Sequence, residues 1–279
     1  MLSFTENSQE LLFHYTTRDA ALGGILPSRK FRFSSFEDMR DPYENKDWSL
    51  PGASNVDALN DPEGEAANRR YFEVQAIAND VKRQARLAGF CMSGRVDRNT
   101  CDHGWSRASM WEHYGESHRG VCLVFDREKL ISSTLESLHS AELPKPYYKP
   151  VLYELDFRYN PMIEINREVV DMNSEQLRAF MFQFVEDHNE HLFYRKATDW
   201  STEMEFRFVV TVPDGFSSPI EVDVQDALVG LVAGERFPDW AVPGTLEITR
   251  NLEITAKQIV WTGHDTYLTD LEPSIEWTD

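Results

Sequence analysis

The stretch that most constrains the fold of this chain is residues 199–210, where polar and apolar side chains alternate from Thr202 onward. Strict alternation is typical of a β-strand, because successive side chains of a strand point to opposite faces of its sheet. It places Glu203, Glu205 and Arg207 on one face and four large apolar residues on the other. Two interpretations follow. Spacing alone favours a solvated sheet face with a Glu–Arg pair, whereas a Glu-x-Glu strand in a catalytic site is the more specific alternative.

The composition is that of a folded, water-soluble chain. The 279 residues are 41% hydrophobic and carry a formal net charge of −19. This length accommodates one large domain. The charge argues against broad affinity for phosphate backbones or anionic lipid, although it does not exclude a local basic groove that binds nucleic acid.

Three further features predict a cytoplasmic location. The three cysteines, Cys91, Cys101 and Cys122, are odd in number and have no framework spacing, which favours reduced thiols. The first residues lack a basic region followed by an apolar run, so no secretion signal is expected. No apolar stretch approaches the roughly 18 residues of a spanning helix, so no membrane association is expected.

Hydrophobic periodicity predicts many short strands, with helices in clusters rather than in strict β-α-β alternation. Long helices are expected at residues 65–87 and 174–194, and a loop rich in Pro, Gly, Asn and Asp at 50–64. Strands are expected at residues 11–15, 30–34, 89–93, 119–125, 151–155, 220–224, 228–233, 246–248 and 258–262. The fold class is therefore α+β: a single domain over residues 1–279, with its core at about 11–265 and a mobile loop at 50–64.

Several kinds of site find little support in the motifs. His188 and His191 lie three apart on a predicted helix and could share a cation, but the glutamate of the zinc-protease motif is missing, so no metal site is predicted. There is no Gly-x-Ser-x-Gly elbow and no phosphate-binding Gly-x-x-x-x-Gly-Lys loop. A metal-dependent hydrolase using the histidine pair remains the least favoured alternative.

The remaining pieces suit cleavage of a glycosidic bond. Such a reaction builds positive charge on the sugar, which a carboxylate such as Glu203 or Glu205 stabilises. A histidine or hydroxyl, as in the His14-Tyr15-Thr16 segment, can hold the ribose, and aromatic rings can sandwich a flat leaving group. Each residue also has a plain alternative in core packing or strand-end hydrogen bonding.

Three segments resemble the bacterial family known as domain of unknown function 2971. The first runs from Leu12-Phe13-His14-Tyr15-Thr16 through Asp41-Pro42-Tyr43-Glu44, and the third is Trp200 with Glu203-Met204-Glu205-Phe206-Arg207. The second is the most specific: Trp-x-His-Tyr-Gly-x-x-His-Arg-Gly-Val-Cys-Leu, beginning at Trp111. The resemblance covers about residues 11–265, and the family name carries no activity.

A more distant likeness carries a function. His-x-Thr on the first strand, a Phe-Ser strand and a late Glu-x-Glu look like the split-sheet ADP-ribosyltransferase superfamily, some of whose members are toxins that consume NAD. The likeness implies a split or strongly bent central sheet, Glu205 as the catalytic carboxylate assisted by Glu203, and His14 on the ribose. It also implies that Thr16 holds the ADP-ribose and that Tyr43 stacks on the nicotinamide. Cofactor-binding roles are further expected for Tyr15, Ser34, His113 and Tyr114, and for Arg32 or Arg40 on the pyrophosphate, although the helix that carries His113 and Tyr114 has no counterpart in the transferase pattern.

The expected function is thus NAD-dependent ADP-ribosyl transfer, as a toxin or phage-defence effector. The acceptor is a protein or a nucleic acid, the acidic charge weakly disfavouring the latter, and a second protein that neutralises the enzyme is compatible with this reading. The alternative from another class is a non-catalytic binding or sensor module on the same fold. That module would use the region from Trp111 to His118 for its partner.

Overall fold

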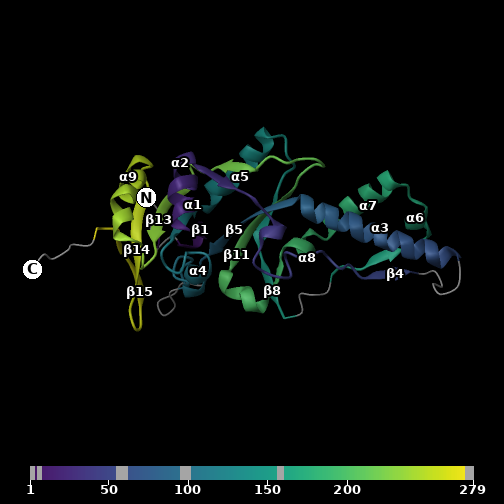
Figure 1. Ribbon diagram of the computed structural model, residues 1–279, viewed down its shortest axis with the longest axis horizontal. Helices are drawn as coiled ribbons and strands as arrows, with labels where there is room; N and C mark the ends of the chain where they lie inside the picture. The colour runs from purple at the N-terminus through teal and green to yellow at the C-terminus, as the bar shows by residue number, and fades with distance from the viewer. Residues whose placement is uncertain (1–3, 5–7, 55–61, 95–101, 156–159, 274–279) are drawn as a thin grey trace, which may run out of the picture.

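The computed structural model describes residues 4, 8–54, 62–94, 102–155 and 160–273 (Figure 1). It is an α+β fold with a central mixed sheet flanked by helices, which confirms the predicted fold class. Within the described residues, no helix is long and apolar enough to cross a membrane.

Nine strands form the central sheet among the described residues. Eight follow the order β15-β14-β13-β6-β1-β5-β11-β7, and β3 also pairs with β5. Among the described pairs of this sheet, β13 and β14 run parallel and the others antiparallel. The strand bounds are β1 Leu11–Thr16, β3 Ser34–Ser35, β5 Ala85–Met92, β6 Val121–Asp126, β7 Tyr147–Pro150, β11 Glu205–Thr211, β13 Leu228–Ala233, β14 Thr255–Trp261 and β15 Thr266–Asp270. Three two-stranded sheets pair β2 (Lys30–Arg32) with β12 (Glu221–Asp223), β4 (Gly52–Ser54) with β9 (Ile163–Ile165), and β8 (Leu152–Glu154) with β10 (Arg195–Ala197).

The sheet is split along one edge of β5. On that edge β1 pairs with β5 only at Leu12–Met92 and Phe13–Cys91, while β3 pairs with β5 at Leu87 and Arg86. Residues 88–90 of β5 therefore have no partner on this side among the described strands, although their other edge pairs with β11 throughout. The gap lies inside the sheet rather than at its rim.

The helices lie around this sheet, and α3 and α7 extend together toward the end of the molecule farthest from both termini (Figure 1). Their bounds are α1 Arg18–Ala20, α2 Leu26–Ser28, α3 Pro62–Gln84, α4 Ala108–His113, α5 Arg127–Ser140, α6 Arg167–Asp171, α7 Ser174–Asp187, α8 Asn189–Phe193 and α9 Val242–Asn251, with a π-helix at Ala21–Ile25. Short 3₁₀ turns occur at Ser8–Glu10, Phe36–Asp38, Thr198–Glu203 and Asp239–Ala241.

The two sheet faces bury different apolar clusters. One cluster covers one face with Leu12, Phe90, Phe125 and Phe208 among its members. The opposite face carries two clusters, one between the sheet and helices α3 and α7, the other around Trp105 and Trp111. This arrangement follows from strand alternation, because neighbouring residues of one strand enter different clusters.

Several predicted elements need correction. Residues 246–248 were expected to form a strand but lie in α9, where Val242, Thr245 and Thr249 are buried at helical spacing. The helix expected at 174–194 is broken at His188, whose Nδ1 lies 2.8 Å from the carbonyl oxygen of Phe184. The helix expected at 65–87 begins at Pro62 and ends at Gln84, because Ala85 and the residues after it pair with β11.

The predicted loop at 50–64 is only partly described. Gly52–Ser54 forms β4, which pairs with β9, and Pro62 already belongs to α3. Residues 55–61 and Cys101 lie outside the described residues, so the predicted mobility of that loop stays a prediction.

Candidate active site

The central strand β11 begins at Glu205, three residues later than the alternation predicts. Thr198–Glu203 forms a 3₁₀ turn, and Met204 adopts a left-handed conformation with φ 41°. Arg107 holds this turn, since its Nη1 donates to the carbonyl oxygens of Thr202 (3.1 Å) and Glu203 (2.8 Å). Its Nη2 donates to the carbonyl oxygen of Met92 at 2.7 Å, which ties the turn to the end of β5.

The charged face of β11 is buried, so the expectation of a solvated face is wrong. Arg207 is fully buried, and Glu203 and Glu205 are 6% and 7% exposed. The expected Glu–Arg pair does form: Arg207 Nε and Nη2 contact both Glu205 oxygens at 2.8 and 2.7 Å. Bidentate pairing of this kind fixes the orientation of the carboxylate.

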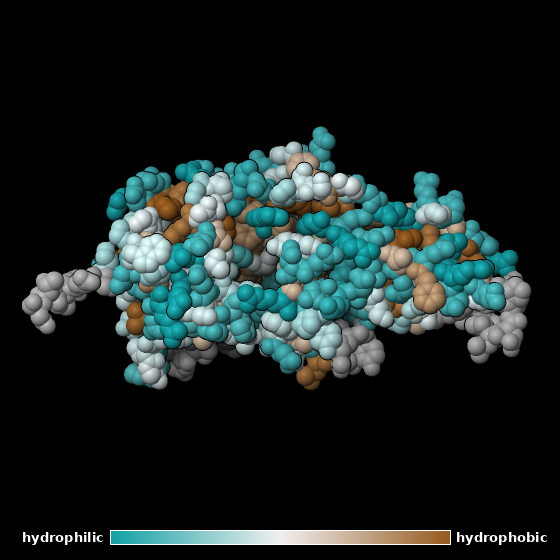
Figure 2. Space-filling model, viewed as in Figure 1, coloured by the Kyte–Doolittle hydropathy of each residue, from teal (hydrophilic) through white to brown (hydrophobic). Residues whose placement is uncertain are grey.

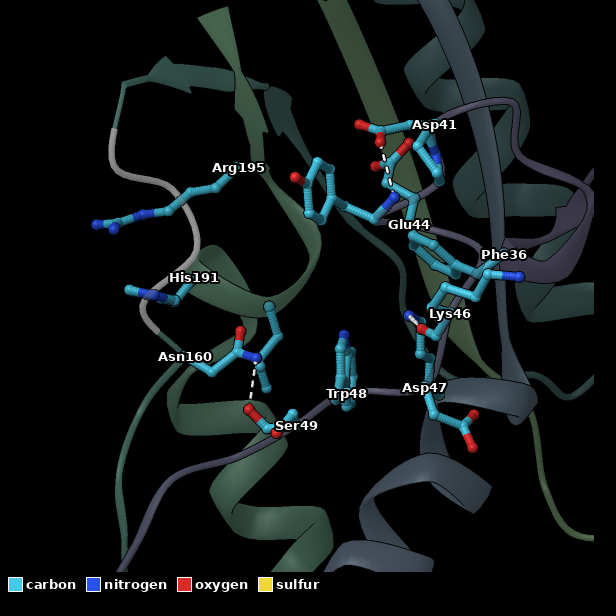
Figure 3. A pocket seen from close by; sticks show the side chains of 14 residues that line it. Phe36, Asp41, Glu44, Lys46, Asp47, Trp48, Ser49, Asn160, His191 and Arg195 are labelled. Atoms are coloured by element: carbon cyan, nitrogen blue, oxygen red, sulfur yellow. Dashed lines mark hydrogen bonds between the residues drawn. The ribbon is translucent and has the colours of Figure 1, made fainter.

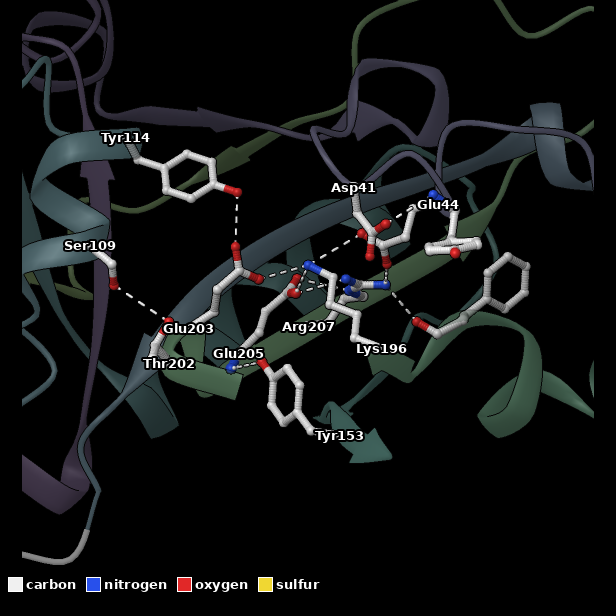
Figure 4. A network of polar contacts seen from close by, with 12 residues as sticks. Asp41, Glu44, Ser109, Tyr114, Tyr153, Lys196, Thr202, Glu203, Glu205 and Arg207 are labelled. Carbon is white, nitrogen blue, oxygen red and sulfur yellow. Dashed lines mark hydrogen bonds and ion pairs between the residues drawn. The ribbon is translucent and has the colours of Figure 1, made fainter. Parts of the chain in front are cut away.

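Two residues that the sequence analysis did not select complete a buried ion network (Figure 4). Lys196 Nζ lies 2.7 Å from Glu203, 2.9 Å from Glu205 and 3.2 Å from Glu44. Arg207 Nη1 lies 2.6 Å from Glu44, and Tyr114 donates to Glu203 at 2.8 Å. Three carboxylates thus face two cations, so one proton on a carboxylate would make the cluster neutral.

The two glutamates of β11 and its preceding turn have oppositely shifted pKa values. Burial raises the pKa of Glu203, and the nearby charge of Glu205 adds to this shift against the effect of Lys196. Burial alone would also raise the pKa of Glu205, but its ion pairs with Arg207 and Lys196 outweigh burial and lower that pKa to about 2. Glu205 therefore stays ionised, whereas Glu203 is the carboxyl group suited to gain and lose a proton.

A cavity of about 150 Å³ lies at the gap between β1 and β5 and is bounded by both glutamates. Its wall includes residues 13–15 of β1 and 87–91 of β5, and Phe31 and Tyr114 supply further aromatic rings. Because the strands separate here, side chains from both faces of the sheet reach one cavity. His14 belongs to the face of Phe31 and Phe90, opposite to that of Glu205 and Arg207.

His14 is neutral and its hydrogen bond fixes its tautomer. Burial lowers the pKa of His14 to about 4. Its Nδ1 lies 3.1 Å from the carbonyl oxygen of Gly89, an acceptor, so Nδ1 carries the hydrogen and Nε2 is the basic nitrogen. A hydrogen-bonded histidine at the edge of the core was the plain alternative considered from sequence, and this contact agrees with it.

The structure brings together only part of the predicted site. Of the predicted site residues, six line the small cavity: His14, Tyr15, Ser34, Tyr114, Glu203 and Glu205. Tyr15 contributes only its ring, since its hydroxyl donates to the carbonyl oxygen of Gly104 at 2.7 Å. Arg40 lies beside the cavity, with its guanidinium carbon 4.7 Å from the centre of the Tyr114 ring.

Four predicted residues lie elsewhere. Thr16 is not in the cavity wall. Arg32 directly follows Phe31 on β2, and because side chains alternate along a strand, Phe31 points toward the cavity and Arg32 points away from it into solvent. His113 is exposed at the end of α4. Tyr43 lines a different, larger cavity, shown in Figure 3.

Two residues of the ion network, Glu44 and Lys196, were not predicted as site residues because their signals in the sequence are weak. Glu44 ends the Asp-Pro-Tyr-Glu turn, of which only Tyr43 was selected, and Lys196 follows the second long helix without any motif. Gly89 is also required, because a Cβ at this position would lie 2.5 Å from Glu205 Oε1. Among the described residues, no group of three or more His, Cys, Asp or Glu side chains is arranged to hold a metal ion.

Comparison with known families supports one part of the predicted kinship. Residues 110–208 match the model of a family described as "Protein of unknown function (DUF2971)". The match supports the predicted DUF2971 resemblance. It spans the Trp-x-His-Tyr-Gly motif, Lys196 and both glutamates, but leaves out His14 and the Asp-Pro-Tyr-Glu turn. No curated protein and no solved structure matches the chain, and the likeness to ADP-ribosyltransferases is not confirmed.

Proposed function

We propose that the small cavity cleaves the nicotinamide–ribose bond of NAD and transfers ADP-ribose to an acceptor. The observation that carries the proposal is the pair of glutamates beside the cavity, one held ionised and the other with a raised pKa. Pairs of carboxyl groups with separated pKa values are typical of sites that divide electrostatic stabilisation from proton transfer.

In this proposal the cavity holds one flat ring rather than a whole dinucleotide. Its volume of about 150 Å³ suits the nicotinamide group, with aromatic walls at Phe31, Phe90 and Tyr114. The remainder of NAD extends past the rim, where the Arg40 guanidinium is available to a phosphate. Arg32, expected on the pyrophosphate, has no part in this arrangement.

The bond that breaks is the one between ribose C1′ and the ring nitrogen. Its electron pair neutralises the pyridinium, and nicotinamide leaves while positive charge develops on the ribose. The permanently ionised Glu205 stabilises that charge. The ionised form of Glu203 takes the proton of the acceptor as the acceptor bonds to C1′, and neutral His14 offers Nε2 to a ribose hydroxyl.

The test is nicotinamide release from NAD by purified protein, followed by chromatography. Glu203→Gln and Glu205→Gln each remove one carboxylate and should lower the rate at least about a hundredfold. Glu186→Gln is the matched control, because Glu186 sits at the surface on α7 and contacts Tyr147. Full activity in both site variants would disprove the role of the glutamates.

A second function is favoured by the completeness of the ion network. Both oxygens of Glu205 already accept hydrogen bonds from Arg207, and Lys196 contacts Oε2 as well. A network closed in this way also suits a binding module in which the carboxylates shape the cavity and no bond is broken. Saturable NAD binding without nicotinamide release, unchanged by Glu203→Gln, would favour the module.

A further inference from the structure

A second cavity, of about 670 Å³, lies next to the ion network (Figure 3). It is bounded by Phe36 and residues 41–44 and 46–49, by Lys82 of α3, and by His191, Leu192 and Arg195. Glu44 belongs to its wall and also pairs with Lys196, which lines the small cavity. The two cavities therefore lie on either side of one ion network, and the larger has the size typical of small-molecule sites.

Two cationic side chains in this wall, one of them buried and one partly exposed, keep unused donors. Lys82 is 5% exposed, and its ammonium donates to the carbonyl oxygen of Lys46. No carboxylate of the described residues forms an ion pair with it, in contrast to Lys196. The buried Nε of Arg195 has no hydrogen-bond partner among the described residues, although its Nη1 pairs with Glu154 at 3.0 Å. An ammonium has three N–H donors, so an anion can accept hydrogen bonds from the donors of Lys82 that the protein leaves unused.

The cavity also presents a buried acceptor. Asp41 is 2% exposed; its Oδ1 accepts from the backbone N–H of Tyr43 at 2.9 Å, while Oδ2 has no hydrogen-bond partner in the part of the chain that the structure describes. Buried oxygens are almost always paired in folded proteins, so Oδ2 is suited to an N–H or O–H of a ligand. A plain anion cannot satisfy Asp41 and Lys82 together.

The other carboxylates of the wall have cationic partners within the protein. Glu44 pairs with Arg207 and Lys196, and Asp47 lies 3.3 Å from Arg83. Lys82 lies in the field of these carboxylates but forms no ion pair among the described residues, so it can still contact a negatively charged group. Burial lowers the pKa of Lys82 to about 8, so it still carries its charge at neutral pH.

The aromatic part of the wall suits a flat ring. Phe36, Tyr43 and Trp48 line the cavity, and Tyr43 is 56% exposed, so it lies at the mouth. Aromatic side chains stack on nucleobases with little dependence on base identity. Figure 3 shows Asp41 and Glu44 on one side of the space and Arg195 with His191 on the other, with Trp48 between them.

We propose that this larger cavity binds a mononucleotide. The phosphate contacts Lys82, an N–H of the base donates to Asp41 Oδ2, and the ring packs against Tyr43. The inference goes beyond NAD cleavage and does not require it, because it concerns a different cavity and a ligand without a nicotinamide bond.

The experiment is calorimetric titration of the full chain with each of the four nucleoside 5′-monophosphates, with the matching nucleosides and with inorganic phosphate. At least one monophosphate should bind about tenfold or more tightly than its nucleoside and than phosphate. Lys82→Met should remove this advantage of the monophosphate and leave nucleoside binding unchanged. Asp41→Asn should weaken both the nucleotide and the nucleoside.

Lys30→Met is the matched control, since Lys30 is an exposed lysine on β2 that pairs with Glu221. Each variant is first compared with the wild type by thermal unfolding. The proposal is overturned if no monophosphate binds saturably to the wild type at concentrations up to about 10 mM. It is equally overturned if folded Lys82→Met binds nucleotides like Lys30→Met. If the protein does not turn over NAD, the interpretation of these titrations is unchanged, because they contain no NAD.

Discussion

At the residue scale, the decisive feature is the burial of opposite charges with little access to water. Transfer of a charged side chain from water to the protein interior costs free energy. This applies to Lys196, Arg207, Glu203 and Glu205, whose mutual attraction offsets the cost only while every partner is present. Apolar residues would stabilise the same volume at least as well. The network therefore argues for a requirement other than stability, which the proposed chemistry supplies.

The depressed pKa of Glu205 predicts a loss of stability in acid. Its ordinary pKa of 4.5 applies to the unfolded chain and falls to about 2 in the fold. The native carboxylate therefore contributes stability above about pH 4.5, and this contribution disappears as the pH falls toward 2. The shift corresponds to about 3 kcal/mol. Urea unfolding at a series of pH values should show a steeper decline for wild type than for Glu205→Gln, and parallel curves would contradict the assignment.

The pKa of Glu203 is raised whereas that of Glu205 is lowered, and the raised pKa predicts a pH dependence of activity. Its raised pKa means that the folded protein holds this proton at higher pH than the unfolded chain does. If its ionised form accepts the proton of the acceptor, nicotinamide release should rise with pH through that pKa. The rising limb should be absent from the residual activity of Glu203→Gln. A limb that persists unchanged would assign it to another group.

The chemical types of these side chains could be read from the sequence, but their surroundings could not. Alternation correctly placed Glu205 and Arg207 on one face. It could not show that the face is buried, because Glu44 comes from a distant part of the chain and Lys196 belongs to no motif. The likeness to ADP-ribosyltransferases joined His14 to Glu205 in one site, without indicating that they occupy opposite faces and meet only where the sheet is split.

At the element scale, the split edge of β5 creates the site. Gly89 sits in the gap, gives its carbonyl oxygen to His14 and leaves room for the Glu205 side chain. Within a strand, glycine otherwise weakens packing, so its presence is explained by this close approach. The gap itself was expected only from the likeness to split-sheet enzymes, and strand pairing is what demonstrates it.

Gly89→Ala should therefore be costly. Its Cβ would lie 2.5 Å from Glu205 Oε1, so the carboxylate has to move from the bidentate pair with Arg207. We expect a loss of about 1–3 kcal/mol in the free energy of unfolding, together with loss of nicotinamide release. Gly24→Ala is the matched control, because a Cβ there meets nothing within 4 Å and the residue is helical. An equal effect of both substitutions would mean that Gly89 has no special role.

Elements defined by long-range pairing were the ones that the sequence misplaced. Residues 85–87 continue the helical pattern of α3, yet they form strand because both β11 and β3 pair with them. The start of β11 shifted because Arg107 stabilises the preceding turn through carbonyl oxygens, which no side-chain pattern reveals. Leu228–Ala233 was predicted at its observed bounds, since an apolar run buried in the centre of a sheet needs no other information.

At the scale of the whole molecule, most of the charge lies outside the ion network. The face in view in Figure 2 is mainly hydrophilic, and the formal net charge is −19. Like charges on a compact surface repel one another, which destabilises the fold relative to the expanded chain. Exposed pairs such as Lys30–Glu221 and Arg167–Asp171 act in the other direction, but each contributes at most about 1 kcal/mol.

Salt should therefore stabilise this protein. Between about 10 mM and about 300 mM NaCl the screening length falls severalfold, which weakens the surface repulsion while the buried network is little affected. The free energy of unfolding, measured with the uncharged denaturant urea, should rise over this range. Because the network is shielded from salt, wild type and Glu205→Gln should gain by the same amount. A fall in stability with salt would mean that surface ion pairs outweigh the excess of negative charge, and unequal gains would mean that solvent ions reach the network.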